Sequence, residues 1–284
     1  MRKETYLKSI IFCASAVLFY SSYAKSETWT TVDYPGATKT IPYGINGNNI
    51  VGCYSDGSSN NHGFLYDGTN WTTLDYPGAT STSPYGISGN NIIGSYSSSD
   101  GYGHGFIYDG TNWTTILIIP RGIDGSNIVG GNQLYNITTQ ILTAINYPGA
   151  TSTGLTGISG NNIVGSYQDS QYFPHSFLYD GSNWTTLSWS CPIPQGIDGS
   201  NVVGSFVLYN ITTQSHTTLK YPGSALTQLY GISGNSIVGF YENGDPYGLP
   251  ENFSAPHGFV YTIPEPCTLL LLGLGAAISR RKQK

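Results

Sequence analysis

The chain has 284 residues, and its 16 Asp and Glu residues outnumber its 11 Lys and Arg residues. Seven of these cations lie near the two ends, so residues 25–262 hold four Lys or Arg against fourteen Asp or Glu. Nucleic acids and anionic lipids are bound through clustered basic side chains. The composition therefore argues against both as partners of the central region.

The first residues have the pattern of a secretion signal. Arg2, Lys3 and Lys8 precede an apolar run from Ile10 to Tyr20, and small residues near Ala24 suit a cleavage site. We therefore predict three segments: a signal peptide at 1–24, a repeat domain at 25–262 and a C-terminal tail at 263–284.

One nine-residue phrase dominates the central region, in the form GISGNNIVG or a close variant. It recurs six times, beginning at Gly44, Gly86, Gly122, Gly157, Gly196 and Gly231. A second phrase, of the form HGFLYDGTNWTTL, follows at His62, His104 and His175, while the third and fifth copies have LYNITTQ in its place. Repeats of about 40 residues are typical of propeller blades.

Each unit predicts four short strands, which in the second copy are Tyr85–Ser88, Asn91–Tyr96, Gly105–Tyr108 and Trp113–Ile116. Apolar residues alternate there with small or polar ones, and Asn, Asp and Gly lie at the turns. No stretch of residues 25–262 has helical periodicity. We predict an all-β, six-bladed β-propeller with four-stranded blades.

The ends of the repeat region indicate how the ring closes. Residues 29–32 read as a fourth strand without a third before it, and residues 258–261 read as a third strand without a fourth after it. Pairing the two would complete the sixth blade and remove two free strand edges. An open β-solenoid remains the alternative architecture.

The triplets His62-Gly63-Phe64, His104-Gly105-Phe106, His175-Ser176-Phe177 and His257-Gly258-Phe259 resemble the His-Ala-Phe triplet of bacterial extracellular HAF-type repeats. The resemblance covers nearly the whole repeat region but rests on a short motif. It implies an extracellular location and no particular activity.

The tail resembles a PEP-CTERM sorting signal. A Pro-Glu-Pro triplet is followed by Cys267, a short apolar run from Leu269 to Ile278 and a basic cluster; the residues matching the motif are Pro264, Glu265, Pro266, Arg280, Arg281 and Lys282. The run is short for a stable bilayer span, which needs about 20 residues. The sequence predicts a short C-terminal transmembrane helix that anchors the protein in the inner membrane only before processing.

This resemblance implies that an exosortase removes the tail and that the body reaches the cell surface or the exopolysaccharide matrix of a Gram-negative bacterium. A plain C-terminal membrane anchor is the alternative.

The recurring polar residues are predicted to be structural. The four triplet histidines begin strands of different blades, too far apart to share one metal ion, and each is expected to bond within its own blade. The acids that recur in turns or fourth strands are expected to be structural too: Asp33, Asp67, Asp75, Asp109, Asp124, Asp180 and Asp198.

His216 takes a position that other copies fill with Trp, and we expect its side chain to pack there as the Trp side chain does. Cys53 and Cys191 occupy non-equivalent positions, which favours two buried thiols and leaves a disulfide open.

Acids outside the repeat pattern fall between the second and third strands. If the first strand is innermost, these loops share one face, the variable face, with the connections between blades. The candidate ligand residues on it are Asp56, Asp100, Tyr102, Tyr172, Glu242, Asp245 and Tyr247, and Tyr54, Phe173 and Tyr241 lie in the same loops. Aromatic side chains beside short polar groups can bind sugars, although solvated loop tips would give the same pattern.

Three functions remain open at this point: a structural matrix component associated with exopolysaccharide, a lectin-like binding propeller, and a polysaccharide hydrolase or lyase. The last needs a close carboxylate pair, which the pattern does not indicate. We predict a non-enzymatic protein without metal or cofactor.

Overall fold

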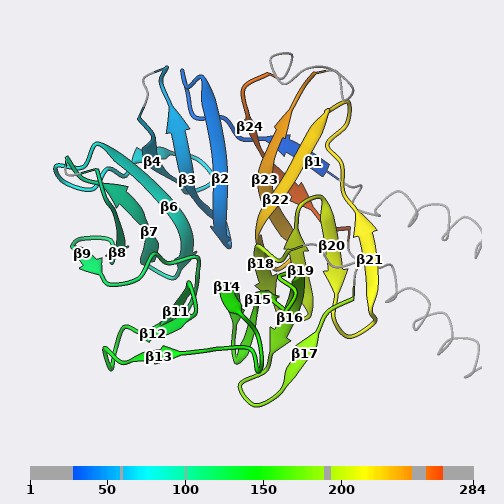
Figure 1. Cartoon of the computed structure of the whole chain (residues 1–284). Helices are drawn as coiled ribbons and strands as arrows, with labels where there is room; N and C mark the ends of the chain where they lie inside the picture. The colour runs from blue at the N-terminus through cyan, green and yellow to red at the C-terminus, as the bar shows by residue number, and fades with distance from the viewer. Residues whose placement is uncertain (1–27, 58–59, 100, 189–192, 245–253, 265–284) are drawn as a thin grey trace, which may run out of the picture. The chain divides into compact units, whose positions relative to one another are not determined.

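The computed structural model describes residues 28–57, 60–99, 101–188, 193–244 and 254–264. Its strands form six four-stranded antiparallel sheets, each one blade of a β-propeller (Figure 1). The predicted fold is confirmed. Signal-peptide residues 1–24 and tail residues 265–284 lie outside the described part.

Four blades are full, with a first strand of eight residues. Blade 1 is β2 (Lys39–Asn46), β3 (Asn49–Ser55), β4 (His62–Tyr66) and β5 (Trp71–Thr73). Blade 2 is β6 (Ser81–Ser88), β7 (Asn91–Ser97), β8 (Gly103–Tyr108) and β9 (Trp113–Ile116). Blade 4 is β14 (Ser152–Ser159), β15 (Asn162–Gln168), β16 (Pro174–Tyr179) and β17 (Trp184–Thr186). Blade 6 is β22 (Leu226–Ser233), β23 (Ser236–Glu242), β24 (His257–Thr262) and β1 (Thr28–Thr31).

Two blades are trimmed, with a first strand of three residues. Blade 3 is β10 (Gly122–Asp124), β11 (Asn127–Gly130), β12 (Gln133–Asn136) and β13 (Leu142–Ala144). Blade 5 is β18 (Gly196–Asp198), β19 (Asn201–Gly204), β20 (Val207–Asn210) and β21 (Ser215–Thr218). The expected second-copy strands are confirmed, but its first strand begins at Ser81 instead of Tyr85, because residues before the repeat phrase also pair with the second strand.

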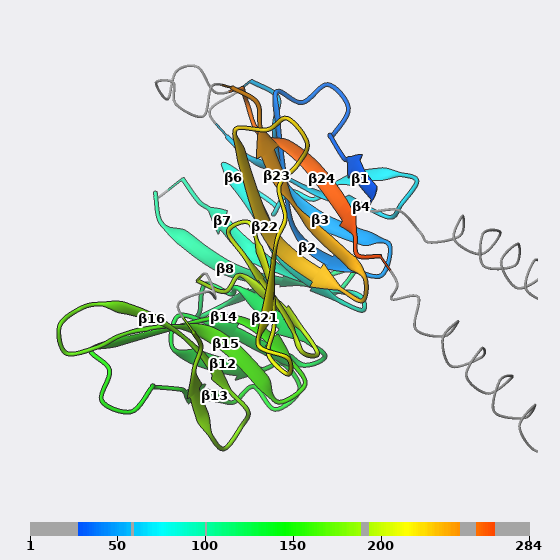
Figure 2. The same ribbon diagram turned by 90° about the vertical axis from the view of Figure 1, so that its right-hand side faces the viewer.

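The ends of the propeller pair as predicted. β1 lies beside β24 at the edge of blade 6 in both views (Figures 1 and 2). The Val32 N–H donates to the Gly258 carbonyl at 2.8 Å, and the same bond joins Leu74 to Gly63 at 2.8 Å in blade 1, whose strands are continuous in sequence. Trp29 packs on Phe259 and Tyr261 with ring centroids 5.0 and 4.6 Å apart. Blade 6 therefore has the same construction as the other full blades.

The first strands form a closed inner ring, in which β2, β6, β10, β14, β18 and β22 each contact the next and β22 contacts β2. The glycine that opens the repeat phrase permits this approach. A Cβ on Gly44 would lie 2.8 Å from the Gly86 Cα, and one on Gly231 would lie 3.1 Å from the Gly44 Cα. The repeat phrase thus keeps glycine where neighbouring backbones meet.

Side chains in the turn of the same phrase link each blade to the next. The residue before each turn accepts a hydrogen bond from the turn glycine N–H of the next blade, at donor–acceptor distances of 2.5 to 3.3 Å. The acceptors are Asn46, Ser88, Asp124, Ser159, Asp198 and Ser233. The bond from Gly47 to Ser233 closes the circle. This explains why Asp124 and Asp198 recur and confirms that they are structural.

Apolar side chains fill the space between adjacent blades. Val51 of blade 1, for example, packs with Ile87 and Phe106 of blade 2. Each full blade buries one phenylalanine of the histidine triplet completely: Phe64, Phe106, Phe177 and Phe259. No helix long and apolar enough to cross a membrane occurs among the described residues.

Candidate functional site

The predicted variable face exists. The turns between first and second strands and between third and fourth strands lie on one side, the turn face, because successive strands are antiparallel. The loops between second and third strands lie on the other side with the connections between blades. The variable face carries Tyr102 and Tyr172, which are 72% and 70% exposed. Asp100, Asp245 and Tyr247 lie outside the described residues.

The tip of blade 4 is the best-defined part of the variable face. Asp169 Oδ1 accepts hydrogen bonds from the backbone N–H groups of Gln171 (2.8 Å) and Phe173 (3.0 Å). Its Oδ2 accepts a bond from His175 Nε2 at 2.8 Å, and these bonds, with that to His175 the strongest cause, lower the pKa of Asp169. Tyr172 has φ of 65°, a conformation that non-glycine residues seldom adopt. The loop is therefore organised to hold Tyr172 and Phe173 out into solvent.

A groove of about 350 Å³ lies next to this tip, where blade 4 meets the connection to blade 5. Its lining combines polar groups with apolar surface: Pro174, His175, Ser176, Thr186, Leu187, Ser188 and Ile193. Ile193 is 49% exposed, and Phe206 of trimmed blade 5 is 50% exposed on the same face. Polar groups among apolar walls, at this volume, are what a small-ligand site needs.

A larger cavity of about 500 Å³ opens on the turn face between blades 6 and 1, with Tyr66 and Trp71 in its wall. These two side chains stack on each other with centroids 4.5 Å apart. They belong to the repeated phrase and pack the blade, so we assign this cavity to the architecture.

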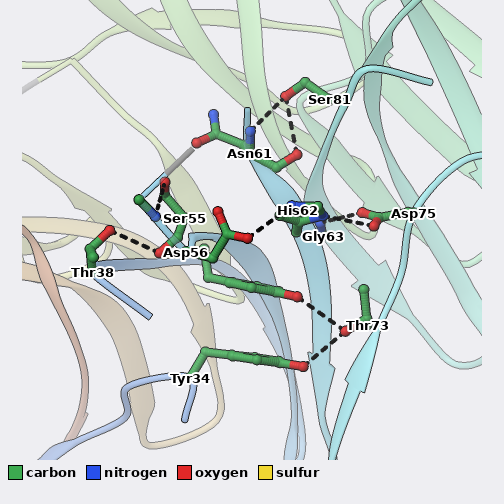
Figure 3. A network of polar contacts seen from close by, with 12 residues as sticks. Tyr34, Thr38, Ser55, Asp56, Asn61, His62, Gly63, Thr73, Asp75 and Ser81 are labelled. Carbon is green, nitrogen blue, oxygen red and sulfur yellow. Dashed lines mark hydrogen bonds and ion pairs between the residues drawn. The ribbon is translucent and has the colours of Figure 1, made fainter. Parts of the chain in front are cut away.

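The triplet histidines bond within their own blades, as predicted. In blade 1, His62 Nδ1 donates to Asp75 Oδ2 at 2.8 Å, while Asp75 Oδ1 accepts the Gly63 N–H at 3.1 Å. Figure 3 shows His62 between Asp75 and Asp56, whose carboxylate lies 4.0 Å from Nε2. In blade 6, His257 and Asp33 repeat the arrangement at 2.8 Å. The candidate ligand residue Asp56 therefore lies beside a structural pair.

Blades 2 and 4 use the other imidazole nitrogen because Leu117 and Ser188 stand where blade 1 has Asp75. His104 Nε2 bonds Ser98 Oγ at 3.1 Å, and His175 bonds Asp169. The triplet histidine is thus hydrogen-bonded through Nδ1 to an aspartate after the fourth strand in blades 1 and 6, and through Nε2 to a residue of the loop between second and third strands in blades 2 and 4.

Stacked tyrosine pairs explain more of the aromatic content than the sequence indicated. In blade 1, Tyr34 and Tyr54 stack with centroids 3.7 Å apart and planes 3° apart, and both hydroxyls reach Thr73 Oγ1 (Figure 3 shows Tyr34). The equivalent pairs are Tyr76–Tyr96, Tyr147–Tyr167 and Tyr221–Tyr241. Tyr54, Tyr96 and Tyr167 recur at one repeat position, and their stacking shows that they belong to the architecture.

This pairing corrects the expected composition of the variable face. Tyr54 and Tyr241 were placed in the loops of this face, and they are packing residues, with Tyr241 only 8% exposed. Glu242 is half-buried, pairs in register with Leu226, and has its pKa raised by burial. His216 pairs with Tyr209 in the register of the tryptophans, yet it is exposed, so its expected packing role is wrong.

A small pocket of about 70 Å³ lies on the propeller axis. Each blade contributes the residue just before its repeat-phrase glycine: Tyr43, Tyr85, Arg121, Thr156, Gln195 and Tyr230. We did not predict these residues as a site. The sequence contained an indication of this site, since the residue before the repeat-phrase glycine varies between blades while the glycine itself does not.

Two further predictions concern metals and thiols. Among the described residues, no group of three or more His, Cys, Asp or Glu side chains could hold a metal ion. Cys53 is a free, buried thiol whose pKa is raised by burial. Cys191 lies outside the described residues.

Comparisons with known proteins show little beyond architecture. No protein-family model matches the chain, and no curated protein matches it. A solved structure described as YCF48 bound to D1 peptide covers 84% of this chain and 97% of its own, at 13% identity and a TM-score of 0.42. A structure of the AfRom2 CNH domain covers 83% of this chain and 99% of its own, at 10% identity and a TM-score of 0.36. Neither likeness carries an argument about a ligand.

Proposed function

We propose that this chain is an exported, non-enzymatic propeller of the bacterial surface or matrix that binds extracellular polysaccharide through its variable face. One observation carries the proposal: Tyr172 and Phe173 are held in solvent by bonds to Asp169, beside a groove of about 350 Å³. Aromatic faces can cover the apolar patches of a sugar ring, while the exposed Ser188 offers a hydrogen bond to its hydroxyls.

The bonding of the acids supports binding over hydrolysis. Asp169 is occupied by His175 and two backbone N–H groups, and Asp33 and Asp75 each hold one histidine and one backbone N–H. Carboxylates occupied in this way position loops and strands. A hydrolase needs a pair of carboxyl groups facing one substrate bond.

Export and processing are supported by the sequence. The last strand, β24, ends at Thr262, so the Pro264-Glu265-Pro266 triplet begins two residues after the propeller is complete. A cut there would release an intact ring. We expect Glu265→Ala with Pro266→Ala to leave the protein attached to the inner membrane of its native host, as fractionation and immunoblotting would show. Normal release of this variant would disprove the processing proposal.

Glycan binding by the purified full chain tests the binding proposal. We expect saturable binding to a defined set of polysaccharides, and a loss of about fivefold or more in affinity for Tyr172→Ala and Phe173→Ala, because each removes an aromatic contact worth about 1 kcal/mol. Ile141→Ala is the matched control, since Ile141 is 60% exposed but lies on the turn face. Absence of binding to any glycan, or an equal effect of all three substitutions, would contradict the proposal.

A further inference from the structure

The six residues that line the axial pocket divide into two walls. Blades 6, 1 and 2 provide Tyr230, Tyr43 and Tyr85, whose neighbouring rings lie 4.9 and 5.4 Å apart. Blades 3, 4 and 5 provide Arg121, Thr156 and Gln195. An aromatic wall therefore faces a polar wall with one positive charge, in which the Thr156 hydroxyl already donates to the Val164 carbonyl at 3.2 Å.

Arg121 is the only arginine among the described residues, and it has no carboxylate partner there. Its guanidinium lies over the Tyr85 ring, 5.1 Å from the centroid, and the pocket lining contains no Asp or Glu. The nearby acid Asp124 is bonded to the Gly160 N–H of the next blade. In contrast, His62, His175 and His257 each have a carboxylate within hydrogen-bonding distance. A positive charge without a carboxylate partner, in a protein of negative net charge, suits an anionic ligand.

The charge of Arg121 also acts on the pKa of one tyrosine of the opposite wall. Burial raises the pKa of Tyr230, and the nearby Cys53 adds to the rise, but Arg121 acts in the opposite direction. Blade 3, which carries Arg121, is separated by two blades on each side from blade 6, which carries Tyr230. The guanidinium therefore acts on the tyrosine of the opposite blade.

The trimmed blades open this pocket toward the variable face. In full blade 1, β2 begins at Lys39, five residues before Gly44, whereas β10 of blade 3 begins at the equivalent Gly122 itself. Arg121 therefore precedes its strand and is exposed. Gln195 has the same position in trimmed blade 5. Arg121 is thus exposed and Gln195 half-buried at the start of the two shortened strands, on the side of the variable face.

The dimensions and chemistry of the pocket limit what can enter. A volume of about 70 Å³ is enough for a carboxylate group but not for a whole sugar ring. Arginine matches a carboxylate in bidentate geometry, and the Gln195 amide and Thr156 hydroxyl lie in the same wall. A sugar ring carrying that carboxylate would remain at the mouth, between the polar wall and the tyrosines.

We propose that the axial mouth binds the carboxylate of a uronic acid residue in an acidic polysaccharide, with Arg121 as the cation that selects it. This inference rests on the proposed function and names its ligand class. It adds a second contact point on the variable face, distinct from the groove beside blade 4.

The test compares acidic and neutral oligosaccharides of equal length by titration calorimetry with the full chain. The probes are oligogalacturonate, its methyl ester and a neutral galacto-oligosaccharide. We expect the wild type to prefer oligogalacturonate over its ester at least about tenfold, and Arg121→Gln to abolish this preference. Arg121→Lys should restore part of it, because the charge remains but the bidentate geometry is lost. Lys220→Gln, which removes an exposed cation elsewhere, should leave the preference within about twofold.

Each alternative result has a defined meaning. Equal binding of acidic and neutral oligomers, unaffected by Arg121→Gln, would overturn the axial site and leave the polysaccharide proposal standing. Competition by inorganic phosphate or sulfate as strong as that by oligogalacturonate would show a general oxyanion site and overturn the uronate assignment. Absence of all glycan binding would end both proposals. Thermal unfolding of each variant shows whether a loss of binding reflects a loss of folding.

Discussion

The full and trimmed blades share an inner half and differ in their outer half. Both kinds keep the repeat-phrase glycine, the buried residues beside it and the turn bond to the next blade. Only the full blades have the stacked tyrosine pair, the triplet histidine and the completely buried phenylalanine. At the phenylalanine position, the trimmed blades have Gln133 and Val207.

This difference shows that closure of the inner ring does not depend on the packing of the outer strands. The inner strands require only a small residue at the point of closest approach and a turn acceptor, so a three-residue first strand is sufficient. The outer strands of a full blade form a second core around the phenylalanine. Blades 3 and 5 lack this phenylalanine-centred core, and their first strands are correspondingly shorter.

The largest expected effect is on the free energy of unfolding, and it compares the outer strands of a full blade with those of a trimmed blade. Phe177→Ala should lower the free energy of unfolding by about 3–5 kcal/mol, because Phe177 is completely buried and the site cannot refill. Gln133→Ala, at the same position of trimmed blade 3, should cost less than about 1 kcal/mol. Urea denaturation of the full chain measures both. Similar losses would mean that the trimmed blades have an outer core of their own.

A smaller effect tests the closure of blade 6. Trp29→Ala should cost about 3 kcal/mol, because Trp29 packs on Phe259, Tyr261 and Tyr221. Hydrogen exchange should also accelerate in β24 more than in β20, since β1 protects the edge of β24. His216→Ala is the matched control, because His216 has the tryptophan register in blade 5 but is exposed. A destabilised variant whose β24 amides exchange no faster than in the wild type would show that β1 does not close the ring in solution.

The smallest effect concerns pH and the turn between third and fourth strands. Full blades 1, 2 and 4 cap this turn with Asp67, Asp109 and Asp180, whose pKa values are lowered chiefly by backbone hydrogen bonds. Trimmed blades use Asn136 and Asn210, which make equivalent bonds to Thr139 and Thr213 and do not titrate.

A carboxylate with a lowered pKa contributes stability above its unfolded value of about 4 and loses it as the pH falls through the folded pKa. Asp109→Asn should therefore change the melting temperature little at pH 7 and reduce its fall between about pH 5 and pH 2. Asn136→Asp should make that fall steeper. Melting curves across this pH range measure both, and identical pH profiles in all three proteins would show that the caps do not contribute.

The sequence by itself determined the number of blades, the strand order, the closing pair and the face on which the loops vary. It could do so because the repeat displays each strand six times and each turn five or six times, which distinguishes the pattern from chance. The same repetition correctly indicated that the triplet histidines and the recurring aspartates are structural.

Only the tertiary structure decided how residues from different blades combine. Tyr54 and Tyr241 looked available in the loops, but the preceding connections bring Tyr34 and Tyr221 onto their faces. Arg121 looked unremarkable until the ring placed it with five equivalent positions around one axis. A local pattern fixes strands and turns because their hydrogen bonds join close neighbours in sequence, whereas an axial pocket depends on closing a ring of six units.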